Sequence, residues 1–154
     1  MTTQTRTSEL EAVNTILSTI GESPLNTLSG SLPVDGTIAK NVLSEVSREV
    51  QSQGWHFNTH YKVTLTRDTD NKIPLATNIV RVEVDPRRYS KVSYDIVQRN
   101  NFLYNLAKNE ETFDTNFKDA TAVYLLPFDE IPEQAKRYIT IRSARIFHDR
   151  TLGA

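Results

Sequence analysis

Two patterns in this chain place residues that could do chemistry close together in sequence. His56 and His60 are four positions apart, a spacing that lets two imidazoles bind one metal ion when both lie on a helix. Gly54 precedes them and a strand-like segment follows, so we expect neither a helix nor a metal site there. The pairs Glu110–Glu111 and Asp129–Glu130 are adjacent in sequence, and their spacing does not direct two carboxyl groups at one substrate, as glycoside hydrolysis requires.

Sequence patterns for nucleotide binding and covalent catalysis are also missing. The five glycines lack the spacing of a phosphate-binding loop, and no serine stands in a nucleophile elbow. The absence of cysteine excludes disulfides and thiolate metal sites. We therefore predict that the protein is not an enzyme and has no catalytic residues, cofactor or metal. With no signal-like apolar start and no apolar run near the ~20 residues of a membrane span, we expect a soluble, unexported chain.

The first element is predicted to be a capped helix that opens a helical hairpin over residues 8–54. Ser8 and Glu11 have the spacing of a capping box. Apolar residues then recur every three or four positions and form one stripe, which consists of Leu10, Val13, Leu17 and Ile20. Gly21 suits the left-handed residue that follows a helix, and Pro24 prevents its continuation.

A second amphipathic helix is expected to begin near Asp35, as its N-cap, and to end at Gly54. Its predicted buried stripe is Ala39, Val42, Leu43, Val46 and Val50. Trp55, the single tryptophan, and Phe57 follow at once. We predict that these two aromatic residues, together with Gly21 and Gly54, are structural anchors, and that Trp55 buries a large surface where the hairpin meets the sheet.

Residues 55–127 alternate apolar and polar side chains in short segments, which is the period of half-buried strands. The predicted strands contain Tyr61, Val63 and Leu65, then Val80, Val82 and Val84, then Val92, Tyr94 and Ile96, and then cover residues 102–106 and 122–126. Residues 68–71 form a turn cluster, and residues 108–119 a long polar connection. A small, mostly antiparallel sheet with exposed loops follows from this pattern.

The last predicted element is a helix within residues 128–150, with Pro132 in its first turn and Asp129 or Glu130 near its positive end. Its predicted apolar face consists of Ala135, Tyr138, Ile139 and Ile146, with Arg142 in the same row. An arginine in such a row either extends its head to water or pairs with a carboxylate across an interface. We predict an α+β fold in a single domain over residues 1–154: a helical hairpin and a C-terminal helix packed with the sheet.

The net charge of −1 gives no overall attraction to nucleic acid, but the charges are unevenly distributed. The last helix is basic, with Lys136, Arg137, Arg142, Arg145 and Arg150. The middle of the chain is acidic, with Glu110, Glu111, Asp114 and Asp119. This asymmetry suits a protein that packs against its neighbours through opposite faces, and we predict that these residues are its interface candidates. The alternative is a DNA-binding module that uses the arginine-rich helix, whose binding would weaken steeply with salt.

Three segments of the chain carry a family resemblance. The first segment is Leu10-Glu11-Ala12-Val13-Asn14, with Ile16-Leu17 and then Ile20-Gly21-Glu22-Ser23-Pro24-Leu25. The second is Val50-Gln51-Ser52-Gln53-Gly54-Trp55-His56-Phe57-Asn58. The third is Phe128-Asp129-Glu130-Ile131-Pro132-Glu133, followed by Tyr138-Ile139 and Ala144-Arg145. In this order, the three segments resemble the tail tubular protein A family, the adaptors of short-tailed bacteriophages (podoviruses).

The resemblance implies a structural protein of the virion tail, assembled in the cytoplasm of the host bacterium and without membrane contact. Such adaptors form a dodecameric ring between the portal at the capsid vertex and the nozzle, tail tubular protein B, and tail fibres attach near that junction. Double-stranded DNA leaves the particle through the ring. The basic helix is then expected to meet either a neighbouring copy or the portal. Family members usually continue past the position of Ala154 into another helical segment, so we expect incomplete portal-docking contacts here.

Overall fold

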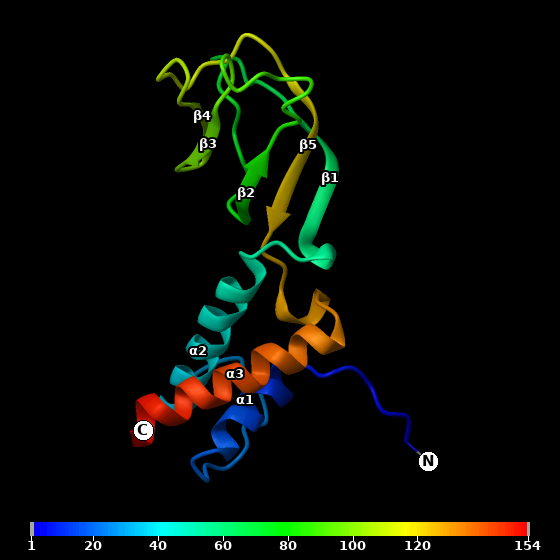
Figure 1. Ribbon diagram of the computed structural model, residues 1–154. Coiled ribbons are helices and arrows are strands. Elements are labelled where there is room, and N and C mark those ends of the chain that lie inside the picture. Colours follow the sequence, from blue (N-terminus) through cyan, green and yellow to red (C-terminus); the bar gives the residue numbers. More distant parts are fainter. Residues whose placement is uncertain (1, 154) are drawn as a thin grey trace. The chain divides into compact units, whose positions relative to one another are not determined.

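The computed structural model describes residues 2–153, and the chain divides into two compact units. One unit combines the residues up to Val50 with those from Leu126 onward and contains the α-helices; the other, Gln51–Leu125, contains the strands (Figure 1). Helices together with antiparallel strands confirm the α+β class. None of the helices within the described range is long and apolar enough to cross a membrane. That the two units behave as a single domain stays a prediction.

α1 (Glu9–Ser18) begins as the capping pattern predicts. The side-chain oxygen of Ser8 accepts a hydrogen bond from the backbone N–H of Glu11 at 3.1 Å. Gly21 has a φ of +76°, which confirms the left-handed residue after the helix. The helix buries Ala12, Val13, Ile16 and Leu17. Leu10 and Ile20, which the periodicity predicts to be buried, are only half-buried because they lie at the two ends of this row.

α2 (Val34–Gln51) buries the predicted stripe of Ala39, Val42, Leu43, Val46 and Val50. It begins before Asp35, so the prediction of Asp35 as N-cap is wrong. The first turn is closed instead by the N–H of Thr37, which donates to the carbonyl of Pro33 at 3.0 Å. Asp35 lies in that turn, where a negative charge stabilises the positive end of the helix. Gly54, with a φ of +79°, follows the end of α2, as predicted.

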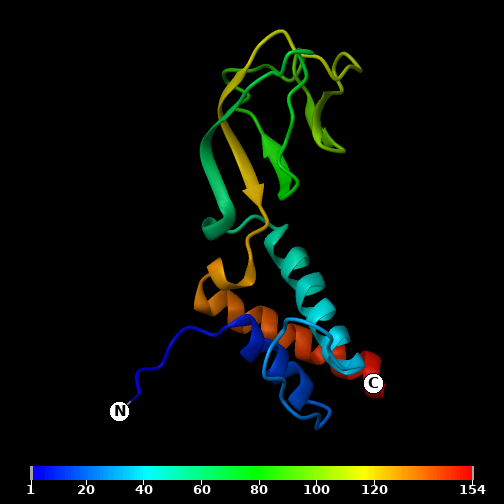
Figure 2. The ribbon, with the colours of Figure 1, turned by 180° about the vertical axis from the view of Figure 1, so that it is seen from behind.

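α3 (Glu133–Leu152) begins after Pro132 and packs against α1, as the two opposite views show (Figures 1 and 2). Its buried side chains are Lys136, Ile139, Thr140, Ser143 and Phe147. Only Ile139 belongs to the predicted apolar row, and Tyr138 is exposed. The difference arises because the hydroxyls of Thr140 and Ser143 donate to carbonyls one turn earlier, at 2.7 and 2.6 Å, and can therefore be buried.

β1 (Thr59–Leu65), β5 (Phe117–Tyr124) and β2 (Ile79–Glu83) form an antiparallel sheet in the order β1-β5-β2. The pairing of β1 with β5 shifts register between His60 and Val63, next to Lys62, whose φ is +58°. This irregularity breaks the predicted alternation. Leu65 is buried, whereas Tyr61, expected on the same face, is exposed.

A second, two-stranded sheet pairs β3 (Ile96–Arg99) with β4 (Phe102–Asn105). The prediction of a strand from Val92 is wrong, because a turn occupies that segment and Val92 is exposed. β5 starts earlier than predicted, so part of the expected polar connection is strand. Phe117 is central to the core of this unit, with the rings of Phe113, Tyr89 and Tyr94 against it edge to face at 4.8 to 5.4 Å.

Candidate functional site

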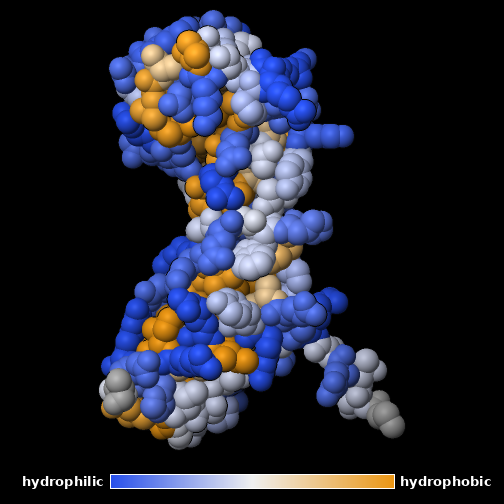
Figure 3. Space-filling view, in the orientation of Figure 1, coloured by the Kyte–Doolittle hydropathy of each residue, from blue (hydrophilic) through white to orange (hydrophobic). Residues whose placement is uncertain are grey.

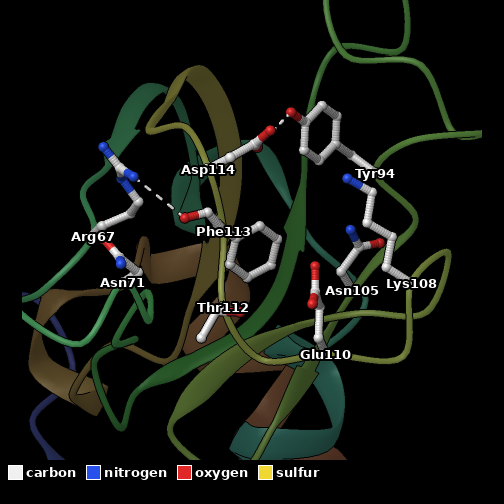
Figure 4. A pocket seen from close by; sticks show the side chains of 9 residues that line it. All are labelled: Arg67, Asn71, Tyr94, Asn105, Lys108, Glu110, Thr112, Phe113 and Asp114. Carbon is white, nitrogen blue, oxygen red and sulfur yellow. Dashed lines mark hydrogen bonds between the residues drawn. The ribbon is translucent and has the colours of Figure 1, made fainter.

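A cavity of about 340 Å³ in the strand unit is lined by charged and aromatic side chains (Figure 4). The hydroxyl of Tyr94 donates to the carboxylate of Asp114 at 2.7 Å; this hydrogen bond lowers the pKa of Asp114 and raises the pKa of Tyr94. The guanidinium of Arg67 donates to the carbonyl of Phe113 at 3.3 Å. These polar groups bind one another and hold the segment around Phe113 in place, so we assign them a structural role.

The candidate metal and acid–base residues do not converge. His56 lies in the short 3₁₀ helix η1 (His56–Asn58), and His60 lies in β1 with its ring 4.4 Å from that of Tyr124. Residues 2–153 contain no group of three or more His, Cys, Asp or Glu that could hold a metal ion. Asp129, in η2 (Phe128–Glu130), accepts from the backbone N–H of Glu9 at 3.2 Å. The carboxylate of Asp129 thus caps the start of α1, and the prediction that Asp129 or Glu130 supports the start of α3 stays a prediction.

Lys136, a predicted interface residue, lies inside the helical unit. It is 2% exposed, and its ammonium donates to the carbonyl of Thr7 at 2.8 Å and lies over the ring of Phe128. The prediction that Lys136 contacts a neighbouring subunit or the portal is therefore wrong, because its side chain is buried. The charge holds the N-terminal segment against α3, an interaction that requires the two ends of the sequence to fold together.

Glu133 completes this attachment of the N-terminal segment. Both its carboxylate oxygens accept hydrogen bonds from Thr7: one from the backbone N–H at 2.8 Å and one from the hydroxyl. These hydrogen bonds hold the pKa of Glu133 below its ordinary value. Thr7 is thus bound through its N–H, its hydroxyl and its carbonyl, which fixes where the chain enters α1.

Arg142 and Arg150 form ion pairs within the chain. Arg142 contacts Glu49 at 2.7 Å, and Arg150 contacts Glu45 at 2.7 Å, so the two pairs connect α3 to α2. The hydrogen bond from Arg150 lowers the pKa of Glu45, and the same bond raises the pKa of Arg150. Each pair is about half exposed and contributes little stability on its own.

Arg137 and Arg145 are the two predicted basic residues that have no ion pair among the described residues. Arg145 lies in an exposed row along α3 that is partly apolar and consists of Tyr138, Ile141, Arg145 and Leu152, with the half-buried His148 beside it. Tyr138 is 54% exposed and Leu152 is 62% exposed. α3 therefore carries apolar side chains on its outer face as well as its buried face, and Figure 3 shows hydrophobic atoms at the surface of the helical unit. Among the described residues, the DNA-binding alternative would therefore have two unpaired arginines on this helix instead of five free basic residues.

The predicted acidic residues mostly have partners within the strand unit. Glu111 pairs with Lys72 at 3.3 Å, and Asp119 pairs with Arg88 at 2.9 Å. Asp114 accepts a hydrogen bond from the hydroxyl of Tyr94, and Glu110 lines the cavity shown in Figure 4. Their role as intersubunit contacts stays a prediction, and any neighbour would have to compete with these internal partners.

Of the predicted anchors after α2, Gly54 is closely enclosed: a Cβ there would lie 3.2 Å from Val123. Phe57 is half-buried, but Trp55 is 45% exposed, so the prediction that Trp55 buries a large surface is wrong. The buried residue of this segment is Asn58, which lies at the end of η1. Its amide donates to the carbonyls of Gln51 at 2.7 Å and Tyr124 at 2.8 Å, and its oxygen accepts from the N–H of Trp55 at 2.9 Å.

Asn14 is a second asparagine whose role the sequence reasoning missed. Its side-chain oxygen accepts from the backbone N–H of Leu25 at 2.7 Å, and its amide donates to the carbonyl of Leu25 at 3.0 Å. Leu25 in turn lies against Gly36, where a Cβ would come within 3.0 Å of it. The spacing of the first sequence motif therefore encodes a closed loop between α1 and α2, and an asparagine inside an amphipathic helix was the available signal.

Comparison with known proteins gives two matches over most of the chain. A family model described as "Tube: Tail tubular protein" matches residues 10–154. The protein named tail tubular protein A of Klebsiella phage KP34 is 30% identical over 132 residues, which are 85% of this chain and 66% of that relative. The chain thus spans just under two thirds of the length of the relative. Asn14, Gly54 and Asn58 all lie within the range that the family model covers.

Proposed function

This chain belongs to the tail tubular protein family, and we propose that it is an adaptor that joins the portal at the capsid vertex to the nozzle of a short-tailed phage. Membership of the family makes it a structural component of the phage tail. We further propose that twelve copies of this chain form a ring, which assembles in the cytoplasm of the host. Its further partners would be the nozzle protein, tail tubular protein B, and the tail fibres.

The observation that carries this proposal is the outer row of α3. A helix of a self-contained unit normally has one apolar face, which packs on the core, and one polar face. α3 instead exposes Tyr138, Ile141 and Leu152 opposite its buried row. Exposed apolar rows of this kind are typical of surfaces that other proteins cover. The helical unit is therefore suited to permanent contact within an assembly.

The charge of the chain is consistent with a ring through which DNA passes. The net charge is −1, and three of the five basic residues of the last helix have partners inside the chain. Duplex DNA is retained by proteins that neutralise several phosphates at once. Where α3 faces the channel, its two arginines that are unpaired among the described residues would hold passing DNA less tightly than five free charges would.

The proposal is tested by mixing the purified chain with the portal and nozzle proteins of the same phage. We expect a three-component complex, seen by native mass spectrometry and electron microscopy, in which the chain lies between portal and nozzle. Portal and nozzle without the chain should remain separate. A chain that binds neither protein, or a portal that binds the nozzle equally well alone, would overturn the adaptor role.

A further inference from the structure

Two small exposed patches on the helical unit combine apolar side chains with one unpaired charge. The α3 patch consists of Tyr138, Ile141 and Arg145, which share one face because they are three and seven positions apart. Tyr138 and Ile141 are exposed, and the guanidinium of Arg145 has no ion pair within residues 2–153. This patch is therefore apolar and positively charged.

The α2 patch consists of Val34, Asp35 and Ile38 at the start of α2. Val34 is 76% exposed, and Ile38, one turn later, is exposed on the same side. Asp35 is half-buried, and its carboxylate has no ion pair among the residues described. This second patch is apolar and negatively charged, the complement of the first.

The two patches are distinct surfaces of one unit. The ion pairs Arg142–Glu49 and Arg150–Glu45 connect α3 with the C-terminal half of α2. Ile38 precedes Glu45 by seven residues, about 10 Å along the helix axis. The α2 patch therefore lies beyond these ion pairs, away from the α3 patch, and one neighbour placed over α3 leaves the α2 patch of the same copy uncovered.

We propose that the α3 patch of one copy binds the α2 patch of the next copy, with Arg145 facing Asp35. This contact is head-to-tail, so repetition produces a closed ring when the rotation between copies closes. The inference rests on the proposed ring and names the surfaces that join its subunits. In a closed ring, this one type of contact would cover both the α3 patch and the α2 patch of every copy.

Charge favours this arrangement over the symmetric alternatives. Two α3 patches facing each other would bring Arg145 against Arg145, and two α2 patches would bring Asp35 against Asp35. The patches are small compared with the roughly 800 Å² per partner of a stable interface. A single contact is thus weak, and closure of the ring, which engages both patches of each copy, strengthens it.

Because the natural chain has no cysteine, engineered disulfides provide the test. We expect a mixture of Ile38→Cys and Ile141→Cys chains to form cross-linked dimers under mild oxidation. The double variant should form a ladder of three or more chains on a non-reducing gel. Val92→Cys, at a highly exposed position of the strand unit, gives the yield from random collision. Cross-linking of Ile141→Cys with itself above this background, or no excess in the mixture, overturns the inference.

Charge reversal provides a second readout in the same cross-linking pair. Arg145→Asp in the Ile141→Cys chain, or Asp35→Arg in the Ile38→Cys chain, should each lower the yield by about fivefold. The two reversals together should restore it. Circular dichroism of each variant verifies the fold. Failure of the combined reversal to restore a yield that both single reversals lower would refute the pairing of Arg145 with Asp35.

The two proposals can fail separately. Cross-links at background level together with a portal–chain–nozzle complex refute the subunit contact and leave the adaptor role standing. A cross-linked ladder from a chain that binds neither portal nor nozzle supports the contact and refutes the adaptor role.

Discussion

Replacement of Asn58 by alanine should strongly destabilise the strand unit. Asn58 is fully buried and makes three hydrogen bonds of 2.7 to 2.9 Å, all to backbone groups. At a net contribution of about 1 kcal/mol for each bond, the free energy of unfolding should fall by about 3 kcal/mol. The carbonyl of Gln51 would keep only the N–H of Gly54, and the carbonyl of Tyr124 would lose the donor from Asn58, so the substitution is costlier than a surface change.

Urea unfolding followed by the fluorescence of Trp55 measures this loss, because Trp55 is the only tryptophan and its backbone N–H donates to the side-chain oxygen of Asn58. Asn26→Ala is the matched control, since Asn26 is exposed and should change stability by less than ~0.5 kcal/mol. A loss below ~1 kcal/mol for Asn58→Ala, or one equal to that of the control, would show that Asn58 is not the anchor.

The Asn58→Asp variant separates hydrogen bonding from packing. Its carboxylate keeps the shape and the acceptor for the N–H of Trp55, but at neutral pH it has no proton to donate to the carbonyls of Gln51 and Tyr124. The pKa of the new carboxyl should therefore be higher in the folded than in the unfolded chain, and the variant should regain stability relative to the natural chain as pH falls. Destabilisation that does not change with pH would argue against this account.

Three further predictions concern the helical unit. Asn14→Ala should lower the free energy of unfolding by about 2 kcal/mol, measured by urea unfolding, because it removes two hydrogen bonds to the backbone of Leu25. The pKa of Glu133 is lowered, so its attachment to Thr7 should be intact above pH 4.5 and be lost as pH falls through the lowered pKa. The amide resonance of Thr7 in NMR should report this titration, and Glu133→Gln should abolish it. Arg142→Ala should cost less than ~1 kcal/mol in thermal unfolding, because the ion pair to α2 is about half exposed; a larger cost would mean that this pair is a structural anchor.

Local patterns in the sequence predicted the elements whose cause is local. The capping pair Ser8 and Glu11, the left-handed Gly21 and Gly54, and the buried stripe of α2 depend on residues within one or two turns, and the structure confirms them. The same holds for the turn at residues 68–71, where Asp68 accepts from the N–H groups of Asp70 and Lys72. The interface residues were harder to predict from the sequence, because the exposure of a helical side chain depends on which distant segments of the chain pack over it.

The sequence alone determined the α+β class, the absence of cysteine chemistry, the helix boundaries to within a few residues and, through three motifs, the tail tubular protein family. Only the tertiary structure decided which charges are free. Lys136 is buried because Thr7, from the other end of the chain, lies against it, and Arg142 is paired because α2 passes beside α3. Asn58 became the anchor in place of Trp55 because β5 brings the carbonyl of Tyr124 within its reach. Partners of this kind are separated by 66 to 129 residues in the sequence, and periodicity carries no information over that range.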